Sequence, residues 1–195
     1  MGKFSIFLSL LAFSMVGALI AKQVLQRGDR GSIVHYPAFP SNFVEPRPIE
    51  VWLPEGYNPS STERYPVIYM HDGQFLFTKS KSWFVWTPWL WKVDVAISDL
   101  IRAKKIRPAI VVAPWTLPGA KRRNEYMPQK PVIEKHDSML IAEGSDIRRT
   151  DINSDNYLRF LVEELKPFID ANYRTLPERA STFTMGSSMG GMVSA

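Results

Sequence analysis

Cysteine is absent from this chain of 195 residues, and histidine is rare, with three in all. Without cysteine the protein cannot form disulfides, thiolate metal sites, a thiol nucleophile or a lipidated cysteine, although an oxidising compartment remains possible. None of the histidines stands in an HExxH-type spacing. We therefore expect no metal site and no cofactor.

Long runs of one charge are also missing. The formal net charge is +5, but the basic residues come in short groups such as Lys104-Lys105 and Lys121-Arg122-Arg123. A surface that binds nucleic acid typically shows a basic stripe interleaved with aromatic residues, which this sequence lacks. We expect a mildly basic surface, no nucleic-acid partner, and one packed domain without internal repeats or low-complexity tracts.

One apolar stretch approaches the length of a membrane span, and it lies at the N-terminus. Lys3 precedes an apolar run over residues 4–20, and small residues stand at Ala18 and Ala21. This order is typical of a signal peptide, so residues 1–21 predict an exported protein, either periplasmic or secreted. The alternative is an uncleaved membrane anchor, because about 18 apolar residues just span a bilayer.

A spacer and a folded domain are expected after the leader. Residues 22–32 are polar and basic with two glycines, which predicts the spacer. The folded domain is then expected to occupy residues 33–195. Within it, residues 33–39 and 49–53 are short β-rich runs with a proline-rich connection, which predicts antiparallel strands at a sheet edge.

Strands and helices alternate along the rest of the chain. Residues 66–70 and 109–114 are continuous apolar runs, which predict buried central strands. Between them, residues 93–105 have the helical spacing of a crossover helix. Residues 154–166 form a second amphipathic pattern, which Pro167 should kink or restart. Such alternation predicts an α/β fold with three layers around a mostly parallel sheet.

The strongest functional signal is the run Gly186-Ser187-Ser188-Met189-Gly190-Gly191, directly after the strand-like residues 181–185. It matches a Gly-x-Ser-x-Gly nucleophile elbow, where glycines flank the serine because the turn from strand to helix is sharp. Ser188 is the candidate nucleophile, and the N–H of Met189 is a candidate oxyanion donor. The alternative is a tight glycine turn in which Ser188 only caps the next helix.

A second oxyanion donor is expected in the loop after residues 66–70. There the sequence reads Met70-His71-Asp72-Gly73-Gln74. Glycine lets the backbone approach a ligand closely, so an N–H of Gly73 or Gln74 is the candidate donor. For His71 we prefer a structural role, holding this loop by hydrogen bonds, over the alternative role of catalytic base.

Candidate substrate contacts are aromatic and basic. Four tryptophans crowd one short stretch: Trp83, Trp86, Trp89 and Trp91. Trp83 and Trp86 are candidates to stack on a ring or sugar of a substrate, unless the cluster packs its loop onto the body. Arg123 is a candidate to orient substrate, or it belongs to a structural ion pair. His35 and His136 are interpreted as surface or hydrogen-bonded structural groups.

Four motifs stand in order along the chain. They are Arg64-Tyr65-Pro66-Val67-Ile68-Tyr69-Met70-His71-Asp72-Gly73-Gln74, Arg123-Asn124-Glu125-Tyr126, Asp155-Asn156-Tyr157 with Glu164-Leu165-Lys166-Pro167, and Gly186-Ser187-Ser188-Met189-Gly190-Gly191. Together they resemble the "Putative esterase" (esterase D-like) family of α/β-hydrolases, which includes feruloyl and other carbohydrate esterases, enterobactin-type siderophore esterases, S-formylglutathione hydrolases and mycolyltransferases. The resemblance implies hydrolysis of a small-molecule or glycan carboxylic ester through an acyl-enzyme on Ser188.

The same resemblance implies that the catalytic triad continues beyond this sequence. In α/β-hydrolases the order is serine, then Asp or Glu, then histidine, so both partners are expected beyond Ala195. Residues 33–195 are then the N-terminal part of an esterase domain whose C-terminal part is missing, and we expect this chain alone to be inactive. The alternatives are an acyltransferase on the same scaffold, or a non-catalytic binding protein if the chain is complete.

Overall fold

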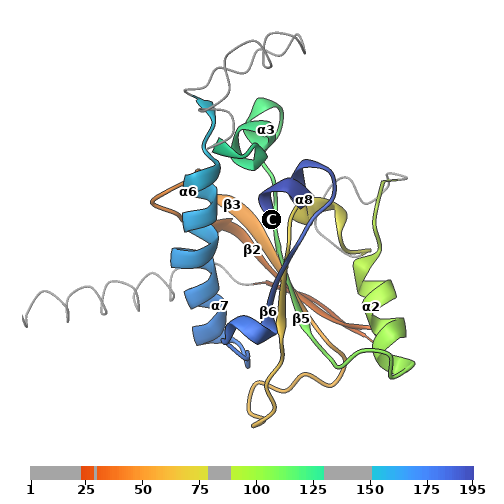
Figure 1. The fold of residues 1–195 in the computed structure, drawn as a ribbon. Helices are drawn as coiled ribbons and strands as arrows, with labels where there is room; N and C mark the ends of the chain where they lie inside the picture. Colours follow the sequence, from red (N-terminus) through yellow and green to blue (C-terminus); the bar gives the residue numbers. More distant parts are fainter. Residues whose placement is uncertain (1–22, 29, 79–88, 130–150) are drawn as a thin grey trace, which may run out of the picture.

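The structure, a computed structural model, describes residues 23–28, 30–78, 89–129 and 151–195. Its centre is a six-stranded sheet with the strand order β1-β2-β3-β5-β4-β6 (Figure 1). The strands are β1 (Gln23–Gly28), β2 (Gly31–Phe39), β3 (Arg47–Leu53), β4 (Val67–Met70), β5 (Ile110–Pro114) and β6 (Thr182–Met185).

The sheet is mixed, so the expectation of a mostly parallel sheet needs correction. In the described residues, the pairs β1–β2, β2–β3 and β3–β5 are antiparallel, whereas β4 pairs parallel with both β5 and β6. Short connections bring consecutive strands back antiparallel, while parallel pairs need a longer crossover. The two central strands predicted from apolar runs are confirmed as a parallel pair.

The expected spacer also differs from the structure, because it contains strand β1. β1 pairs antiparallel with β2, and the register places Gly28 opposite Gly31. Gly31 has φ 85°, and a Cβ there would lie 2.2 Å from the carbonyl oxygen of Leu53. A strand at the sheet edge is held by backbone hydrogen bonds and can carry polar residues, so composition alone suggested a spacer.

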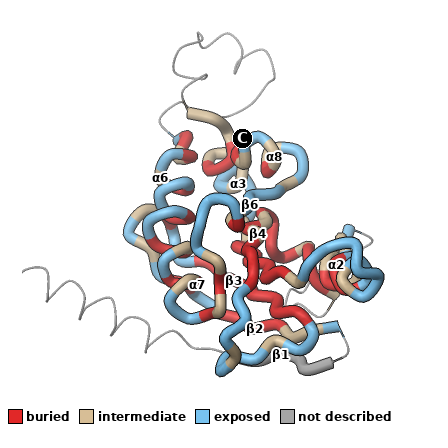
Figure 2. The backbone as a smooth tube through the Cα atoms, turned by 60° about the horizontal axis from the view of Figure 1, so that its bottom comes forward, coloured by how far each residue is buried: buried red, intermediate tan, exposed pale blue. Residues whose placement is uncertain are grey.

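Helices cover both faces of the sheet (Figure 1), which confirms the three-layer α/β architecture. On one face lies a helical column made of α6 (Ser154–Arg159), η4 (Phe160–Leu165) and α7 (Lys166–Asn172). On the other face lies α2 (Val93–Arg102), the predicted crossover helix. Figure 2 shows buried residues concentrated in the strands and on the inward sides of these helices.

At Pro167 the helical column restarts as α7, one of the two predicted outcomes, and α7 follows η4 without a gap. The turn before it, η4, is π-helical, and Pro167 stands at the first positions of α7. Proline lacks an N–H and its ring clashes with the carbonyl four residues earlier in an α-helix. The wider π turn separates these groups, which explains how the chain continues through the proline as one column.

A buried ion pair joins the sheet to a helix at the carboxyl end of the parallel strands. Arg47 on β3 donates from Nη1 and Nη2 to the carboxylate of Glu125 on α3 (Ala120–Tyr126), at 2.7 and 2.6 Å. Arg47 is 1% exposed and Glu125 is 5% exposed. Two parallel N–H···O bonds fix direction as well as distance, so the pair sets the position of α3.

Removing one partner of this pair leaves the other charge buried and alone. We expect Glu125→Ala to lower the free energy of unfolding by about 3–5 kcal/mol. The matched control is Glu55→Ala, which removes the exposed pair with Arg102 and should cost less than about 1 kcal/mol. Urea unfolding followed by tryptophan fluorescence measures both. Equal losses in the two variants would contradict the structural role of the Arg47–Glu125 pair.

Candidate active site

Ser188 stands at a sharp turn between β6 and α8 (Met189–Val193), in a strained backbone conformation (Figure 1). Its φ is 55° and its ψ −124°, which is rare for any residue other than glycine. A Cβ on Gly186 would lie 2.4 Å from the carbonyl carbon of Gly190, so the turn requires glycine there. The local geometry is that of a nucleophile elbow, and the serine is exposed.

The loop after β4 lies against this elbow. Met70 at the end of β4 pairs with Met185 at the end of β6. The residues that follow these two parallel strands therefore lie at the same end of the sheet. A Cβ on Gly190 would lie 3.3 Å from Oδ2 of Asp72 and 3.4 Å from Cβ of His71. The structure therefore brings together the two segments that the sequence assigned to the oxyanion hole.

The candidate oxyanion donors have their N–H groups available. Among the hydrogen bonds of the described residues, none uses the N–H of Gly73, Gln74 or Met189. A Cβ on Gly73 would lie 2.3 Å from the carbonyl oxygen of Ala113, so the loop packs directly on β5. The side chain of Gln74 is buried and accepts a hydrogen bond from the N–H of Thr116 at 3.1 Å. These contacts hold the loop rigidly.

His71 is a buried structural group in this structure. It is fully buried, and its Nδ1 lies 2.8 Å from the hydroxyl oxygen of Tyr157. In the described part of the chain, its Nε2 has no hydrogen-bond partner and no bond joins it to Ser188. Burial lowers the pKa of His71 to about 4, although the charge of Asp72 acts in the opposite direction. The geometry favours the structural interpretation over that of a catalytic base.

The arginine that reaches the candidate oxyanion loop, which follows β4, is Arg122, and the sequence analysis did not single it out. Its Nε and Nη2 donate to the two carboxylate oxygens of Asp72 at 2.7 and 2.8 Å. Arg123, the sequence candidate, lies next to it on α3, and its buried Nε has no hydrogen-bond partner among the described residues. Glu125 of the same motif takes the structural pairing with Arg47. Residues 72 and 122 are 50 residues apart in sequence. The one available signal was the charge of Asp72 next to Gly73, which needs a partner when it is buried.

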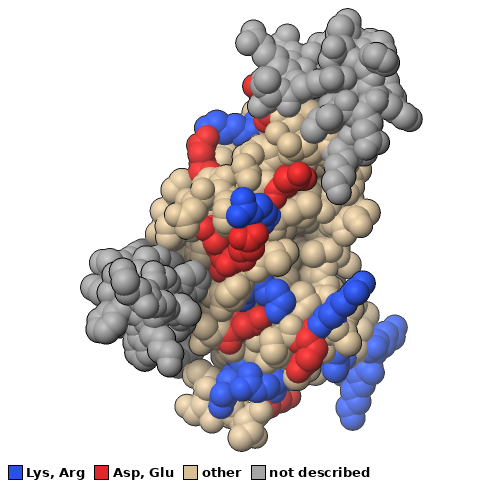
Figure 3. Space-filling view, turned by 60° about the vertical axis from the view of Figure 1, so that its left-hand side comes forward, with Lys and Arg blue, Asp and Glu red and all other residues tan. Residues whose placement is uncertain are grey.

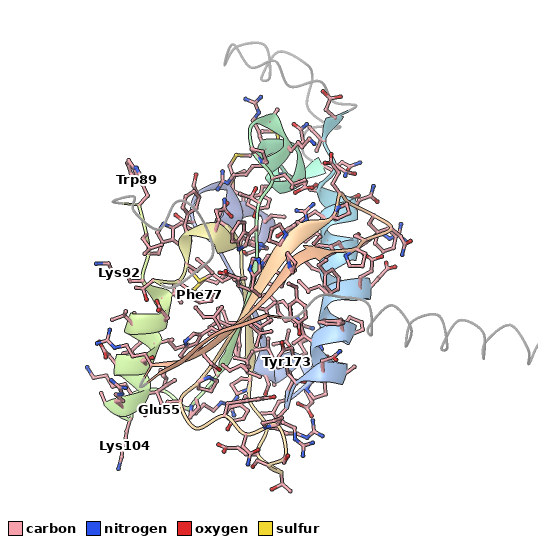
Figure 4. All side chains as sticks on the ribbon, turned by 180° about the vertical axis from the view of Figure 1, so that it is seen from behind. Glu55, Phe77, Trp89, Lys92, Lys104 and Tyr173 are labelled. Carbon is pink, nitrogen blue, oxygen red and sulfur yellow. The ribbon has the colours of Figure 1, made fainter. Side chains whose placement is uncertain are left out.

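The remaining candidates fall partly outside the described residues. Trp83, Trp86 and His136 lie outside them. Trp91 packs against Phe75, with ring centroids 6.3 Å apart, whereas Trp89 is 72% exposed and points away from the body in Figure 4. His35 is buried and lies 3.2 Å from Glu50, which confirms a hydrogen-bonded structural role.

Charges on the outer side of the α6–α7 column are mixed in sign. Figure 3 shows basic and acidic side chains interspersed on this face. Two ion pairs of helical spacing join Arg159 to Glu163 and Lys166 to Asp170. In the residues that the structure describes, no helix is long and apolar enough to cross a membrane, and no group of three metal-ligating side chains gathers. The leader expected over residues 1–21 lies outside them.

A strained serine between a parallel strand and a helix, in a fold of one sheet covered by helices on both faces, is typical of the α/β-hydrolase class. The family model "Putative esterase" matches residues 41–194, and the chain belongs to this family. A curated relative, the endo-1,4-beta-xylanase/feruloyl esterase of Xylanibacter ruminicola, is 30% identical over 145 residues, which are 73% of this chain and 16% of the relative.

Solved structures share the fold. The BES protein from Bacillus cereus is 23% identical with a TM-score of 0.57, over 89% of this chain and 59% of that one. The IroE-like serine hydrolase from Shewanella oneidensis is 22% identical with a TM-score of 0.55, over 89% and 44%. A ferulic acid esterase from Anaeromyces mucronatus, in complex with ferulic acid, is 19% identical with a TM-score of 0.51, over 82% and 50%. This chain thus spans about half the length of the solved structures it resembles.

The buried state of His71 predicts a pH dependence of stability. Its pKa is about 4 when folded against 6.5 when exposed, so between these pH values the unfolded chain binds the additional proton. Stability should therefore fall as pH drops from about 6.5 to about 4, by about 3 kcal/mol at most from this residue. His71→Gln keeps a polar side chain but cannot titrate there.

Urea midpoints of the protein and of His71→Gln between pH 7.5 and pH 4 measure this effect. We expect a shallower pH slope in the variant, whatever its stability at neutral pH. The same slope in both proteins would show that His71 is not buried in its neutral form.

Proposed function

We propose that this chain carries the nucleophile of a serine carboxylic-ester hydrolase that works through an acyl-enzyme. The observation that carries the proposal is the backbone of Ser188, held at φ 55° in a turn that only glycine at position 186 permits. Strain of this kind persists where the surrounding structure maintains it, and it clusters at functional sites. Membership of the "Putative esterase" family supports the same reaction.

The proposed reaction starts with attack of Ser188 Oγ on the ester carbonyl carbon, as the hydroxyl proton passes to a base. The carbonyl oxygen becomes an oxyanion, held by the N–H of Met189 and an N–H of the Gly73–Gln74 segment. Collapse of this intermediate expels the alcohol with a proton and leaves an acyl ester on Ser188. Water then attacks the acyl carbon, releases the acid and restores the serine.

The proposal assigns the catalytic base and acid to residues outside 1–195. In the described residues no histidine or carboxylate is hydrogen-bonded to Ser188, and His71 and His35 are engaged elsewhere. β6 is an edge strand of the described sheet, and Phe183 and Met185 on it are 48% and 50% exposed. Further strands would pair with the open backbone edge of β6, and the layers packed on them would cover these side chains. Residues 1–195 alone should then hydrolyse esters several orders of magnitude more slowly than a complete triad.

The proposed substrate is a small-molecule or glycan ester. The curated relative is a feruloyl esterase, and one solved structure of the same fold contains ferulic acid. These relatives favour an aryl ester, with Trp83, Trp86 and Arg123 kept as candidate substrate contacts. An acyltransferase would use the same serine, so the two reactions are separated by their products when an alcohol acceptor is present.

Replacement of Ser188 tests the nucleophile. The test uses the natural polypeptide, whose length is determined from its intact mass. In this protein we expect Ser188→Ala to lower kcat for 4-nitrophenyl acetate and methyl ferulate by about 10⁴-fold or more. A fluorophosphonate probe should label the unaltered protein on the peptide that contains Ser188, and should not label the variant.

Ser187→Ala is the matched control, because it removes the neighbouring hydroxyl from the same turn. It should keep kcat within about threefold and keep the labelling, since surface changes are usually mild. Ligand binding without labelling would favour the non-catalytic interpretation. Robust turnover by residues 1–195 alone, abolished by Ser188→Ala, would show that the base lies within this chain.

Export is the second part of the proposal, because the leader precedes the described domain. We expect the mature protein in the periplasm or medium to begin after Ala18 or Ala21 when its N-terminus is sequenced. A mature N-terminus at Met1 or Gly2 in the membrane fraction would instead identify the run as an anchor.

A further inference from the structure

The residue just before the candidate oxyanion amides is held in an unusual conformation. Asp72 has φ 61° and ψ 43°, the left-handed region that aspartate tolerates better than most residues. It begins the single turn η1 (Gly73–Phe75), so its backbone angles set the direction in which the N–H groups of Gly73 and Gln74 point. Its carboxylate is 2% exposed.

Helix α3 grips Asp72 at two points. Arg122 donates to both carboxylate oxygens, at 2.7 and 2.8 Å, in the bidentate geometry that best fixes a carboxylate. The N–H of Asp72 donates to the hydroxyl oxygen of Tyr126 at 3.3 Å, and the guanidinium of Arg122 lies 5.1 Å from the ring centre of Tyr126. α3 is itself fixed to β3 by the buried pair of Glu125 with Arg47, so the grip is rigid.

The charge of Asp72 lies beside the elbow. Its Oδ2 is 3.3 Å from the place where a Cβ of Gly190 would stand, one residue after Met189. An unpaired carboxylate there would oppose the negative charge that develops on an ester oxygen, and in a buried site this repulsion is stronger than in water. Pairing with Arg122 offsets that charge and fixes the carboxylate in place through two hydrogen bonds.

We propose that Arg122 is a positioning residue for the oxyanion hole, which holds Asp72 in its left-handed conformation and neutralises its charge. The inference rests on the proposed ester hydrolysis at Ser188. Arg122 acts through Asp72 and the loop, so its loss should reduce transition-state stabilisation more than substrate binding. The defect should therefore appear in kcat and leave KM nearly unchanged.

A set of variants in the natural polypeptide separates geometry from charge. Arg122→Gln removes the clamp and leaves Asp72 unpaired. Arg122→Lys keeps the charge but loses the bidentate contact. Asp72→Asn combined with Arg122→Gln removes both charges, and asparagine still tolerates left-handed angles. Lys121→Gln is the matched control, because Lys121 is the preceding residue on α3 and pairs with Glu45 at the surface.

We expect Arg122→Gln to lower kcat for 4-nitrophenyl acetate by about 10–100-fold, less than the 10²–10³-fold typical when a whole oxyanion donor is removed. Arg122→Lys should recover part of the rate. The double variant should exceed Arg122→Gln by about tenfold, because neighbouring charges couple. Lys121→Gln should match the unaltered protein. A kcat of Arg122→Gln within twofold of Lys121→Gln overturns the proposal, as does a change confined to KM.

Amide hydrogen exchange over residues 73–76 gives a readout that does not depend on ester hydrolysis. Faster exchange in Arg122→Gln than in Lys121→Gln supports the clamp, and equal exchange overturns it. If the unaltered protein hydrolyses no ester, the proposed function fails and this comparison alone decides the role of Arg122. Should Arg122→Gln not fold, kcat and amide exchange of Arg122→Lys and of the double variant are compared with those of Lys121→Gln instead.

Discussion

The parallel pairing of β4 with β6 is the constraint on which the candidate site depends. Met70 and Met185 face each other at the ends of these strands, and each is followed at once by a segment of the site. A shift of register by one residue would move one segment along the other by about 3.3 Å, which is more than an oxyanion hydrogen bond tolerates. The position of Ser188 relative to residues 73–74 is thus set by backbone hydrogen bonds of the sheet.

A buried polar cluster supports this edge from the side of α3 and α6. Tyr157 and His71 share a hydrogen bond, and burial shifts both toward their neutral forms, because it raises the pKa of the tyrosine and lowers that of the histidine. Close by, Arg47 and Arg122 each meet a carboxylate through two hydrogen bonds. Buried polar groups are costly when unpaired, so a cluster in which most members are paired favours one arrangement of these helices.

This arrangement supports the turn at Ser188 and the short helix α8 that follows it. α8 is short and lies at the edge of the described sheet, and Met192 on it is 52% exposed. It contacts α3, which is fixed by Glu125 to β3 and by Arg122 to Asp72 in the loop after β4. The catalytic geometry that we propose is therefore held by elements that precede β6 in the chain, while the serine itself stands on an exposed turn.

The sequence by itself determined the features that depend on neighbouring residues. Apolar runs identified β4 and β5, helical spacing identified α2 and the α6–α7 region, and the glycines around Ser188 identified the elbow, because each pattern reflects local geometry. The tertiary structure decided the rest. Polar residues concealed β1, whose place depends on backbone pairing with β2. Arg122 is hydrogen-bonded to Asp72, and His71 to Tyr157, although these partners are 50 and 86 residues apart in the chain. No local pattern encodes such partners, because only the folded sheet brings them within reach.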